Sequence, residues 1–297
     1  MDEKPGFGRT DEELATLPLN FRPDLMRGQV VLISGGGSGI GRALAYWFAR
    51  LGARVALCGR RIERLERTAE GLRRLGAEVL VEAASIRNPD DVARLQERVW
   101  ARFGTLDVLV NNAGGQFPQP AIDYSVKGWN AVIDTNLNGT WYMMQAAAQR
   151  WRDAGRGGVV VNVVAVVWRG MPGVAHTCAA RAGVIFLSKT LAVEWAPLGI
   201  RINCVAPGII ATEGMDVYPE EARRALPRSN LMRRFGDVTD VADAVTYLAG
   251  PSGGFMTGEV MVVDGGNQVW GDQWTIPRPA WFDEDAPPLN PASARPR

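Results

Sequence analysis

A glycine-rich segment, SGGGSGIG at residues 34–41, stands between an apolar run and a helix-like stretch that reads RALAYWFARLG. Glycines at this spacing permit a tight turn, a close approach of the backbone to a pyrophosphate, and close packing of a helix on a strand. The free N–H groups at the start of such a helix favour an anion. The segment therefore predicts a dinucleotide site with contacts at Gly35, Ser38, Gly39, Ile40 and Gly41. The alternative is a strand-to-helix turn that binds no ligand.

The tip of the second apolar run indicates which dinucleotide is bound. An acidic residue there would bind a ribose 2′-hydroxyl, but the sequence continues with Arg60 and Arg61 after Gly59. Guanidinium groups beside a small residue leave room for a 2′-phosphate and neutralise its charge. The pattern favours NADP(H). The alternative is a solvent-facing pair of arginines at the start of the next helix, where the helix dipole disfavours cations.

The elements that would hold these loops alternate between short apolar runs and amphipathic segments. Apolar runs separated by helices are typical of a parallel sheet that is covered on both faces and connected by right-handed crossovers. We therefore expect an α/β fold, a single Rossmann-type three-layer sandwich with a seven-stranded parallel sheet. Its strands are predicted at residues 29–34, 53–58, 77–82, 106–111, 158–164, 200–206 and 259–264.

The two ends of the chain differ in composition from this pattern. Residues 1–20 are polar, and residues 271–297 are rich in proline. We expect both ends to be flexible or to lie on a neighbouring surface, with the nucleotide-binding domain between them at 21–270. Within that domain, residues 209–236 are predicted to form a lid over the substrate.

The composition excludes several classes of protein. A net charge of +1 gives no electrostatic basis for binding nucleic acid, and no apolar run of about 18 residues indicates a membrane span. Three separated cysteines and a single histidine form no metal-binding pattern. The acidic, polar N-terminus is unlike a secretory signal, so we expect a soluble, cytoplasmic protein without a metal.

The motif set as a whole resembles the short-chain dehydrogenase/reductase family over about residues 25–270. The resemblance rests on SGGGSGIG (34–41), NNAGG (111–115), DTNLNG (134–139), the 173–184 stretch and CVAPGII (204–210). It implies that Asn136 stabilises a helix kink and a water chain. It also implies cofactor contacts at Asn112, Ala113, Gly114, Pro207, Gly208, Ile210 and Thr212.

A closer resemblance is to the peroxisomal trans-2-enoyl-CoA reductases, with the 2,4-dienoyl-CoA reductases next. It rests on IRNPDDV (86–92), NNAGGQF (111–117), KGWNAVIDTNLNGTWYM (127–143), AARAGV (179–184) and LAVEWAPLGIRINCVAPG (191–208). It implies an acyl-CoA substrate and a homo-oligomer, either a dimer or a tetramer. One departure is Ser85, which stands where the family commonly has an adenine-contacting aspartate.

The residues that reduce a ketone in typical members of the family are mostly absent. Thr177 stands at the tyrosine position, Arg181 at the lysine position, and the serine position falls near Val164, so that only Asn136 remains. Hydride transfer to a ketone creates an alkoxide that needs a proton at once, and a tyrosine whose pKa is lowered by lysine supplies it. An aliphatic hydroxyl such as that of Thr177 is a very poor acid. The sequence therefore disfavours a standard carbonyl dehydrogenase.

A conjugated thioester makes a different demand, because hydride addition at Cβ places the charge on the thioester oxygen as an enolate. Arg181 stays protonated and offers a planar set of donors for the nicotinamide ribose and the developing charge. His176, with an ordinary pKa of about 6.5, is the first candidate for carrying the proton. The alternative is that His176 packs at a helix start. Tyr124 and Tyr142 are weaker candidates.

Several residues are candidates for holding the substrate. Gln116 and Phe117 follow the fourth predicted strand, and Met215 lies in the predicted lid. Five lid arginines alternate with apolar residues and could bind the phosphates of coenzyme A, or could form a solvated basic face. These arginines are Arg223, Arg224, Arg228, Arg233 and Arg234.

Three functions are consistent with these residues. The leading hypothesis is NADPH-dependent reduction of the carbon–carbon double bond of a trans-2-enoyl-CoA or a similar conjugated acyl thioester. The second is an atypical carbonyl reductase or alcohol dehydrogenase that uses an unusual acid such as His176. The third is a catalytically silent NADP(H)-binding protein that serves assembly or sensing.

Overall fold

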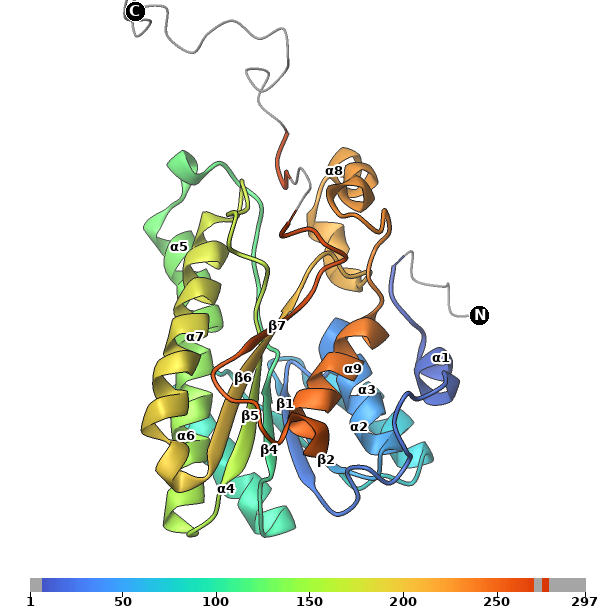
Figure 1. Ribbon diagram of the computed structural model, residues 1–297, viewed down its shortest axis with the longest axis vertical. Coiled ribbons are helices and arrows are strands. Elements are labelled where there is room, and N and C mark those ends of the chain that lie inside the picture. The colour runs from blue at the N-terminus through green and yellow to red at the C-terminus, as the bar shows by residue number, and fades with distance from the viewer. Residues whose placement is uncertain (1–6, 270–273, 278–297) are drawn as a thin grey trace, which may run out of the picture.

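The computed structural model describes residues 7–269 and 274–277 and contains a seven-stranded parallel sheet in the order β3-β2-β1-β4-β5-β6-β7 (Figure 1). The predicted Rossmann-type α/β fold is confirmed, and each strand lies within a few residues of its predicted range. The strands are β1 Val30–Ser34, β2 Arg54–Gly59, β3 Val79–Ala83, β4 Val108–Asn111, β5 Gly158–Val163, β6 Ile200–Pro207 and β7 Val260–Val263.

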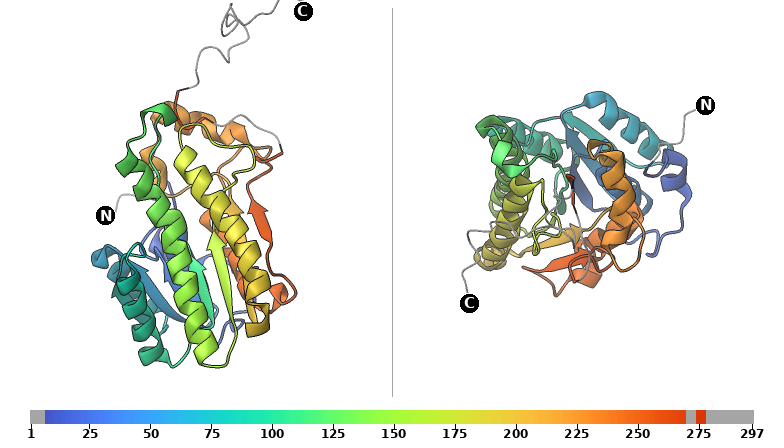
Figure 2. Two further views of the ribbon diagram at one scale, coloured as in Figure 1. Left: turned by 90° about the vertical axis from the view of Figure 1, so that its left-hand side faces the viewer. Right: turned by 90° about the horizontal axis from the view of Figure 1, so that it is seen from above.

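Two layers of helices cover the sheet, which explains why its central strands are apolar on both faces. The helices α2 (Gly39–Arg50), α3 (Ile62–Arg74) and α9 (Val238–Ala249) pack on one face (Figure 1). The helices α4 (Pro89–Phe103), α6 (Gly139–Asp153) and α7 (Ala175–Glu194) pack on the other (Figure 2). Every residue of β1 is buried. None of the described helices is long and apolar enough to cross a membrane.

The order of the strands places the ligand crevice. β1 pairs with β2 on one side, Val31 opposite Val55, and with β4 on the other, Val31 opposite Val108. The direction of the chain across the sheet therefore reverses at β1. In open parallel sheets, ligands bind outside the carboxyl ends of the strands at this reversal.

The described part of the N-terminal segment packs against the domain. Helix α1 (Asp11–Thr16) begins at a capping box formed by Thr10 and Glu13, and Leu14 is buried in the core. Arg50 of α2 donates to the Leu14 carbonyl oxygen at 2.9 Å. The described residues 7–20 therefore lie against the domain beside α2.

The described residues of the C-terminal segment lie near the start of α7. The Thr275 hydroxyl donates to the Pro172 carbonyl oxygen, and a Cβ at Gly173 would overlap Thr275. Thr275 itself is buried. The rest of the predicted proline-rich tail lies outside the described residues.

The segment predicted as a lid leaves the sheet after β6 and returns to it near its own start. It contains the short helices η4 (Glu213–Val217), α8 (Glu220–Ala225) and η5 (Leu226–Ser229). A parallel bridge between Ile210 and Gly236 joins its two ends. Figure 1 shows this segment beyond the carboxyl edge of the sheet, where the ligand crevice is expected.

Candidate functional site

The glycine-rich turn after β1 is packed as a phosphate-binding loop requires. Gly35 adopts a φ of +70°, which residues with a Cβ rarely adopt. A Cβ at Gly41 would overlap the Gly35 carbonyl oxygen and Asn112 Nδ2. Asn112 Nδ2 donates to the Ser34 carbonyl oxygen at 3.0 Å, and Ser34 Oγ accepts from the Ala113 N–H at 3.0 Å. These contacts hold the ends of β1 and β4 together at the crevice.

An acidic side chain from the lid lies at the N-terminus of α2. Glu213 Oε2 accepts from the Gly39 N–H at 3.1 Å, and Glu213 Oε1 pairs with Arg42 at 2.8 Å. Arg42 also pairs with Asp11 of α1 at 3.1 Å. A carboxylate thus occupies the positive end of the helix, in line with the preference of such ends for anions. The sequence pattern did not identify Glu213, because it does not show where the lid touches α2.

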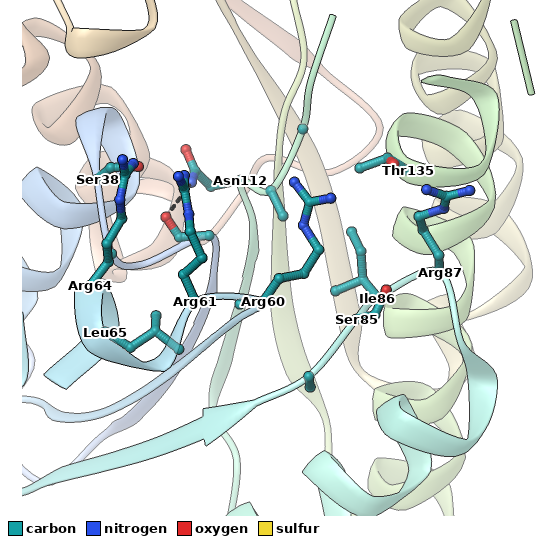
Figure 3. Close-up of a pocket in the computed structure, with 16 residues that line it drawn as sticks. Ser38, Arg60, Arg61, Arg64, Leu65, Ser85, Ile86, Arg87, Asn112 and Thr135 are labelled. Carbon is teal, nitrogen blue, oxygen red and sulfur yellow. Dashed lines mark hydrogen bonds between the residues drawn. The ribbon is translucent and has the colours of Figure 1, made fainter. Parts of the chain in front are cut away.

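A cavity of about 200 Å³ beside the glycine-rich turn is lined by arginines from the loops after β2 and β3 and from helix α3 (Figure 3). Arg60 and Arg61 line this cavity, and Arg64 and Arg87 join them. Arg64 follows Arg61 by three positions on α3, so helical spacing could have revealed it. Arg87 pairs with Asp134 at 3.5 Å, but no aspartate or glutamate is among the described residues that line the cavity.

A second cavity of about 650 Å³ continues from the first under the lid. It is formed by the carboxyl ends of β5 and β6, the loop after β4, the start of α7 and the lid. With one exception, each cofactor residue predicted from the sequence lines one of the two cavities. The exception is Gly41, which acts through the packing of the turn. The predicted substrate residues Gln116 and Met215 line the second cavity, together with Thr177, Arg181 and Asn136.

Arg181 brings a buried cation to the second cavity. The residue is 7% exposed, and burial lowers the pKa of its guanidinium to about 10. Within the described residues, no carboxylate lies at ion-pair distance from it. The Nη2 atom of Arg181 lies so close to Gly114 that a Cβ on residue 114 would overlap it. The cation at neutral pH therefore borders the cavity without an ion-pair partner among the described residues.

Asn136 has a structural task of its own. It lies in a π-helical turn, Asp134–Asn138, between α5 (Val126–Ile133) and α6. Its Oδ1 accepts from the Gly115 N–H at 3.0 Å, and its Nδ2 donates to the Gly115 carbonyl oxygen at 3.0 Å. π-Helical turns are frequent at functional sites. Here the turn fixes the loop that carries Gly114 and Gln116, while the residue still borders the cavity.

His176 and Phe117 lie outside the set of described residues that line the two cavities. His176 is fully buried, stacks on Tyr124 at 4.6 Å between ring centroids, and meets the edge of Phe117 at 4.6 Å. Its Nδ1 accepts from the Thr177 N–H at 2.8 Å. Burial lowers the pKa of His176, against contacts with the backbone of Val174 and Phe117 that raise it. This geometry supports the alternative that His176 packs at the start of the helix. Phe117 packs against His176 and lines neither cavity.

Replacement of His176 by glutamine is expected to leave turnover within about threefold of wild type, since the imidazole does not border the cavity. Because the folded-state pKa is lowered, the folded protein binds a proton less readily than the unfolded chain. Stability is therefore lost as pH falls below the ordinary histidine pKa, and His176→Gln should reduce that loss. Steady-state kinetics and thermal unfolding between pH 5 and about 8 measure both effects. A 100-fold loss of turnover with unchanged cofactor affinity would restore His176 as the catalytic acid.

The two weaker tyrosine candidates are also engaged elsewhere. The Tyr124 hydroxyl donates to the Gly173 carbonyl oxygen at 2.9 Å and accepts from the Ala175 N–H at 3.1 Å. Tyr142 packs against the apolar cluster under α4 and α6. Neither residue is among those that line the two cavities.

Three of the five lid arginines pair with carboxylates of their own region. Arg223 pairs with Asp216 at 3.1 Å, Arg234 with Asp240 at 3.2 Å, and Arg224 with Glu220 one helical turn earlier. These pairs are largely exposed and cost little to break. Binding of coenzyme A phosphates by the lid arginines stays a prediction.

Comparison with known proteins gives the family. A profile described as Enoyl-(Acyl carrier protein) reductase matches residues 35–268. The chain belongs to the short-chain dehydrogenase/reductase family, an oxidoreductase family that uses nicotinamide cofactors.

Two of the similar proteins are named as 2,4-dienoyl-CoA reductases. The chain is 36% identical over 259 residues to a probable 2,4-dienoyl-CoA reductase of Bacillus subtilis, covering 86% of this chain and 100% of the relative. It is 37% identical over 261 residues to a peroxisomal 2,4-dienoyl-CoA reductase of Arabidopsis thaliana, covering 83% and 86%. These names match the second of the two enzyme groups that the sequence resembles.

A solved structure is similar over most of its length. The citronellol catabolism dehydrogenase of Pseudomonas aeruginosa is 38% identical and covers 84% of this chain and 98% of its own, with a TM-score of 0.76. The similarity agrees with the seven-stranded Rossmann-type fold.

Proposed function

We propose that the protein reduces the carbon–carbon double bond of a trans-2-enoyl-CoA or a similar conjugated acyl thioester with NADPH. The observation that carries the proposal is the Arg181 guanidinium, buried beside the cavity without a carboxylate at ion-pair distance among the described residues. The position of the family's catalytic tyrosine holds Thr177, whose aliphatic hydroxyl is a very poor acid. A fixed positive charge in the cavity stabilises the negative charge of an enolate.

In this proposal Gly114 and Asn136 position the site, and Arg181 supplies the positive charge. The reduced nicotinamide supplies a hydride when it is bound. Gly114 lets the Arg181 guanidinium approach the backbone, and Asn136 holds the Gly115 backbone through two hydrogen bonds. Arg181 is then held where negative charge develops on the thioester oxygen. Charge stabilisation by groups that are already in place is a large term in such reactions.

The preference for NADPH is supported by the smaller cavity. Arginines from the loops after β2 and β3 line it without an accompanying aspartate or glutamate among its described residues. A ribose 2′-hydroxyl is usually bound by a carboxylate, whereas a 2′-phosphate is bound by guanidinium groups.

The double variant Arg60→Ala/Arg61→Ala is expected to weaken NADPH binding by about 10–100-fold and NADH binding by much less, because hydrogen bonds to charged groups contribute roughly 1.5–3 kcal/mol. Fluorescence titration with each dinucleotide measures the two dissociation constants. Arg73→Ala is a control on helix α3, which directly follows Arg61, since Arg73 pairs with Glu66 and does not line the cavity. An equal loss for both dinucleotides would contradict a 2′-phosphate site.

A carbonyl reductase or alcohol dehydrogenase is the second candidate, favoured by the name of the similar Pseudomonas structure. Oxidation of NADPH by the purified protein distinguishes the two. Crotonyl-CoA, trans-2-decenoyl-CoA and a panel of ketones are offered in parallel. Turnover on the enoyl-CoAs supports the proposal, and turnover on ketones alone overturns it.

The homo-oligomer that the resemblance implies has a candidate surface on α7. Phe186 and Val193 lie two helical turns apart on this helix and are 70% and 77% exposed. Apolar side chains that gather on one exposed face often mark an interaction surface. We propose that this face joins copies of the chain.

A further inference from the structure

The lid places a phenol in the larger cavity. Tyr218 directly follows η4, and its ring borders the same space as Thr177 and Arg181. Gln116 Nε2, from the loop after β4, donates a hydrogen bond to the Tyr218 hydroxyl oxygen. Sequence spacing does not bring these two residues together, since 102 positions separate them.

The direction of this hydrogen bond leaves the phenol ready to donate. Because the Gln116 amide fills an acceptor position on the Tyr218 oxygen, the hydroxyl proton is free for another partner. Burial raises the pKa of Tyr218, and the hydrogen bond from Gln116 lowers it. The phenol is therefore protonated at neutral pH and can act as a donor.

Other groups near the cavity are poorly suited to the same task. The Glu213 carboxylate accepts from Gly39 and pairs with Arg42, and Asp216 pairs with Arg223 at 3.1 Å. The remaining hydroxyl groups in the lining belong to serine and threonine. Among the described residues that line the larger cavity, Tyr218 is the one phenol.

We propose that Tyr218, oriented by Gln116, is the hydrogen-bond donor to the thioester oxygen and the source of the proton for the reduced substrate, the role that Thr177 cannot fill. The proposal rests on the proposed function. Hydride addition at Cβ forms a C–H bond and moves the double-bond electron pair toward the thioester oxygen as an enolate. The Tyr218 O–H bond then breaks, its proton joins Cα, and the C=O bond re-forms. Water returns a proton to the phenolate.

Tyr218→Phe tests the proposal, because it removes only the hydroxyl group. The matched control is Tyr124→Phe, which removes a hydroxyl that is bonded to Gly173 and Ala175 outside the cavity lining. With crotonyl-CoA, Tyr218→Phe is expected to lower kcat by about 100-fold, and Gln116→Leu by about 10-fold. Dissociation constants for NADPH and for butyryl-CoA should stay within about twofold of wild type.

A binding measurement separates this proposal from the proposed function. Acetoacetyl-CoA can bind as an enolate, so Tyr218→Phe should weaken its binding by at least about 10-fold while butyryl-CoA binding is retained. Equal affinity of wild type and Tyr218→Phe for acetoacetyl-CoA overturns the donor role, whether or not turnover is seen. Parallel loss of butyryl-CoA and NADPH binding would make Tyr218 a packing residue of the lid and also overturn it. A wild-type protein that reduces no enoyl-CoA overturns the proposed function instead.

Discussion

Replacement of Arg181 by methionine is expected to lower enoyl-CoA reduction by about 100-fold or more while leaving the folded protein equally stable or more stable. The two effects have one cause. Arg181 is buried, and the described residues supply no carboxylate at ion-pair distance. A cation in that position disfavours folding, and it is useful only when negative charge develops beside it.

The pKa of Arg181 gives the sign and the size of the stability effect. Burial lowers the pKa of Arg181 to about 10, which corresponds to a penalty of about 3 kcal/mol on the charged form in the folded protein relative to the unfolded chain. The folded protein therefore binds this proton more weakly than the unfolded chain, and the penalty is fully present at neutral pH. It decreases as pH rises above about 10, so the advantage of Arg181→Met should shrink over that range.

Urea unfolding at pH 7, with kinetics on the same preparations, measures both quantities. Arg181→Lys is the matched control, because it retains a cation but loses the planar set of donors. We expect it to keep part of the activity and the lower stability. A loss of several kcal/mol in Arg181→Met would mean that the guanidinium holds the fold together, which contradicts a cation kept for catalysis at a cost in stability.

Replacement of Gly41 by alanine is expected to weaken NADPH binding by at least about 100-fold and to destabilise the fold by about 1–3 kcal/mol. The added Cβ would overlap the Gly35 carbonyl oxygen and Asn112 Nδ2, and it would lie 2.9 Å from the Gly35 carbonyl carbon. The obstacle is mainly backbone, which cannot move aside without opening the turn. That turn carries the hydrogen bonds that join β1 to β4.

Gly115→Ala adds the same methyl group where no protein atom lies within 4 Å of the new Cβ, although it borders the larger cavity, so it serves as the control for the stability change. Titration with NADPH and thermal unfolding are compared for the two variants. Retention of wild-type affinity in Gly41→Ala would show that the turn is not the phosphate-binding loop.

Residues whose role depends on local chain geometry were predictable from the sequence. The seven strands were visible because both faces of the sheet are buried, which makes each strand a continuous apolar run. The glycine-rich turn was visible because its positions relative to the strand and helix are fixed by backbone sterics. The capping box at Thr10 and Glu13 was an equally local signal, and it marks the helix within the segment predicted as a polar extension.

Residues whose role depends on packing between distant segments were not predictable in the same way. His176 and Thr177 are adjacent in sequence, but neighbours on a helix point to different sides, so only Thr177 reaches the cavity. In the loop after β4, Gln116 lines the larger cavity, whereas its neighbour Phe117 packs against His176. Tyr218 and Glu213 lie in the lid, where neither helical nor strand periodicity fixes which side chains turn inward.

The most direct test of an enolate-stabilising site is the product of crotonyl-CoA reduction by NADPH in D₂O, analysed by NMR. If the site stabilises an enolate and protonates it from an exchangeable group, the product is butyryl-CoA with one deuterium at Cα and none at Cβ. Reduction at the carbonyl group, with the double bond intact, would contradict a site built for an enolate.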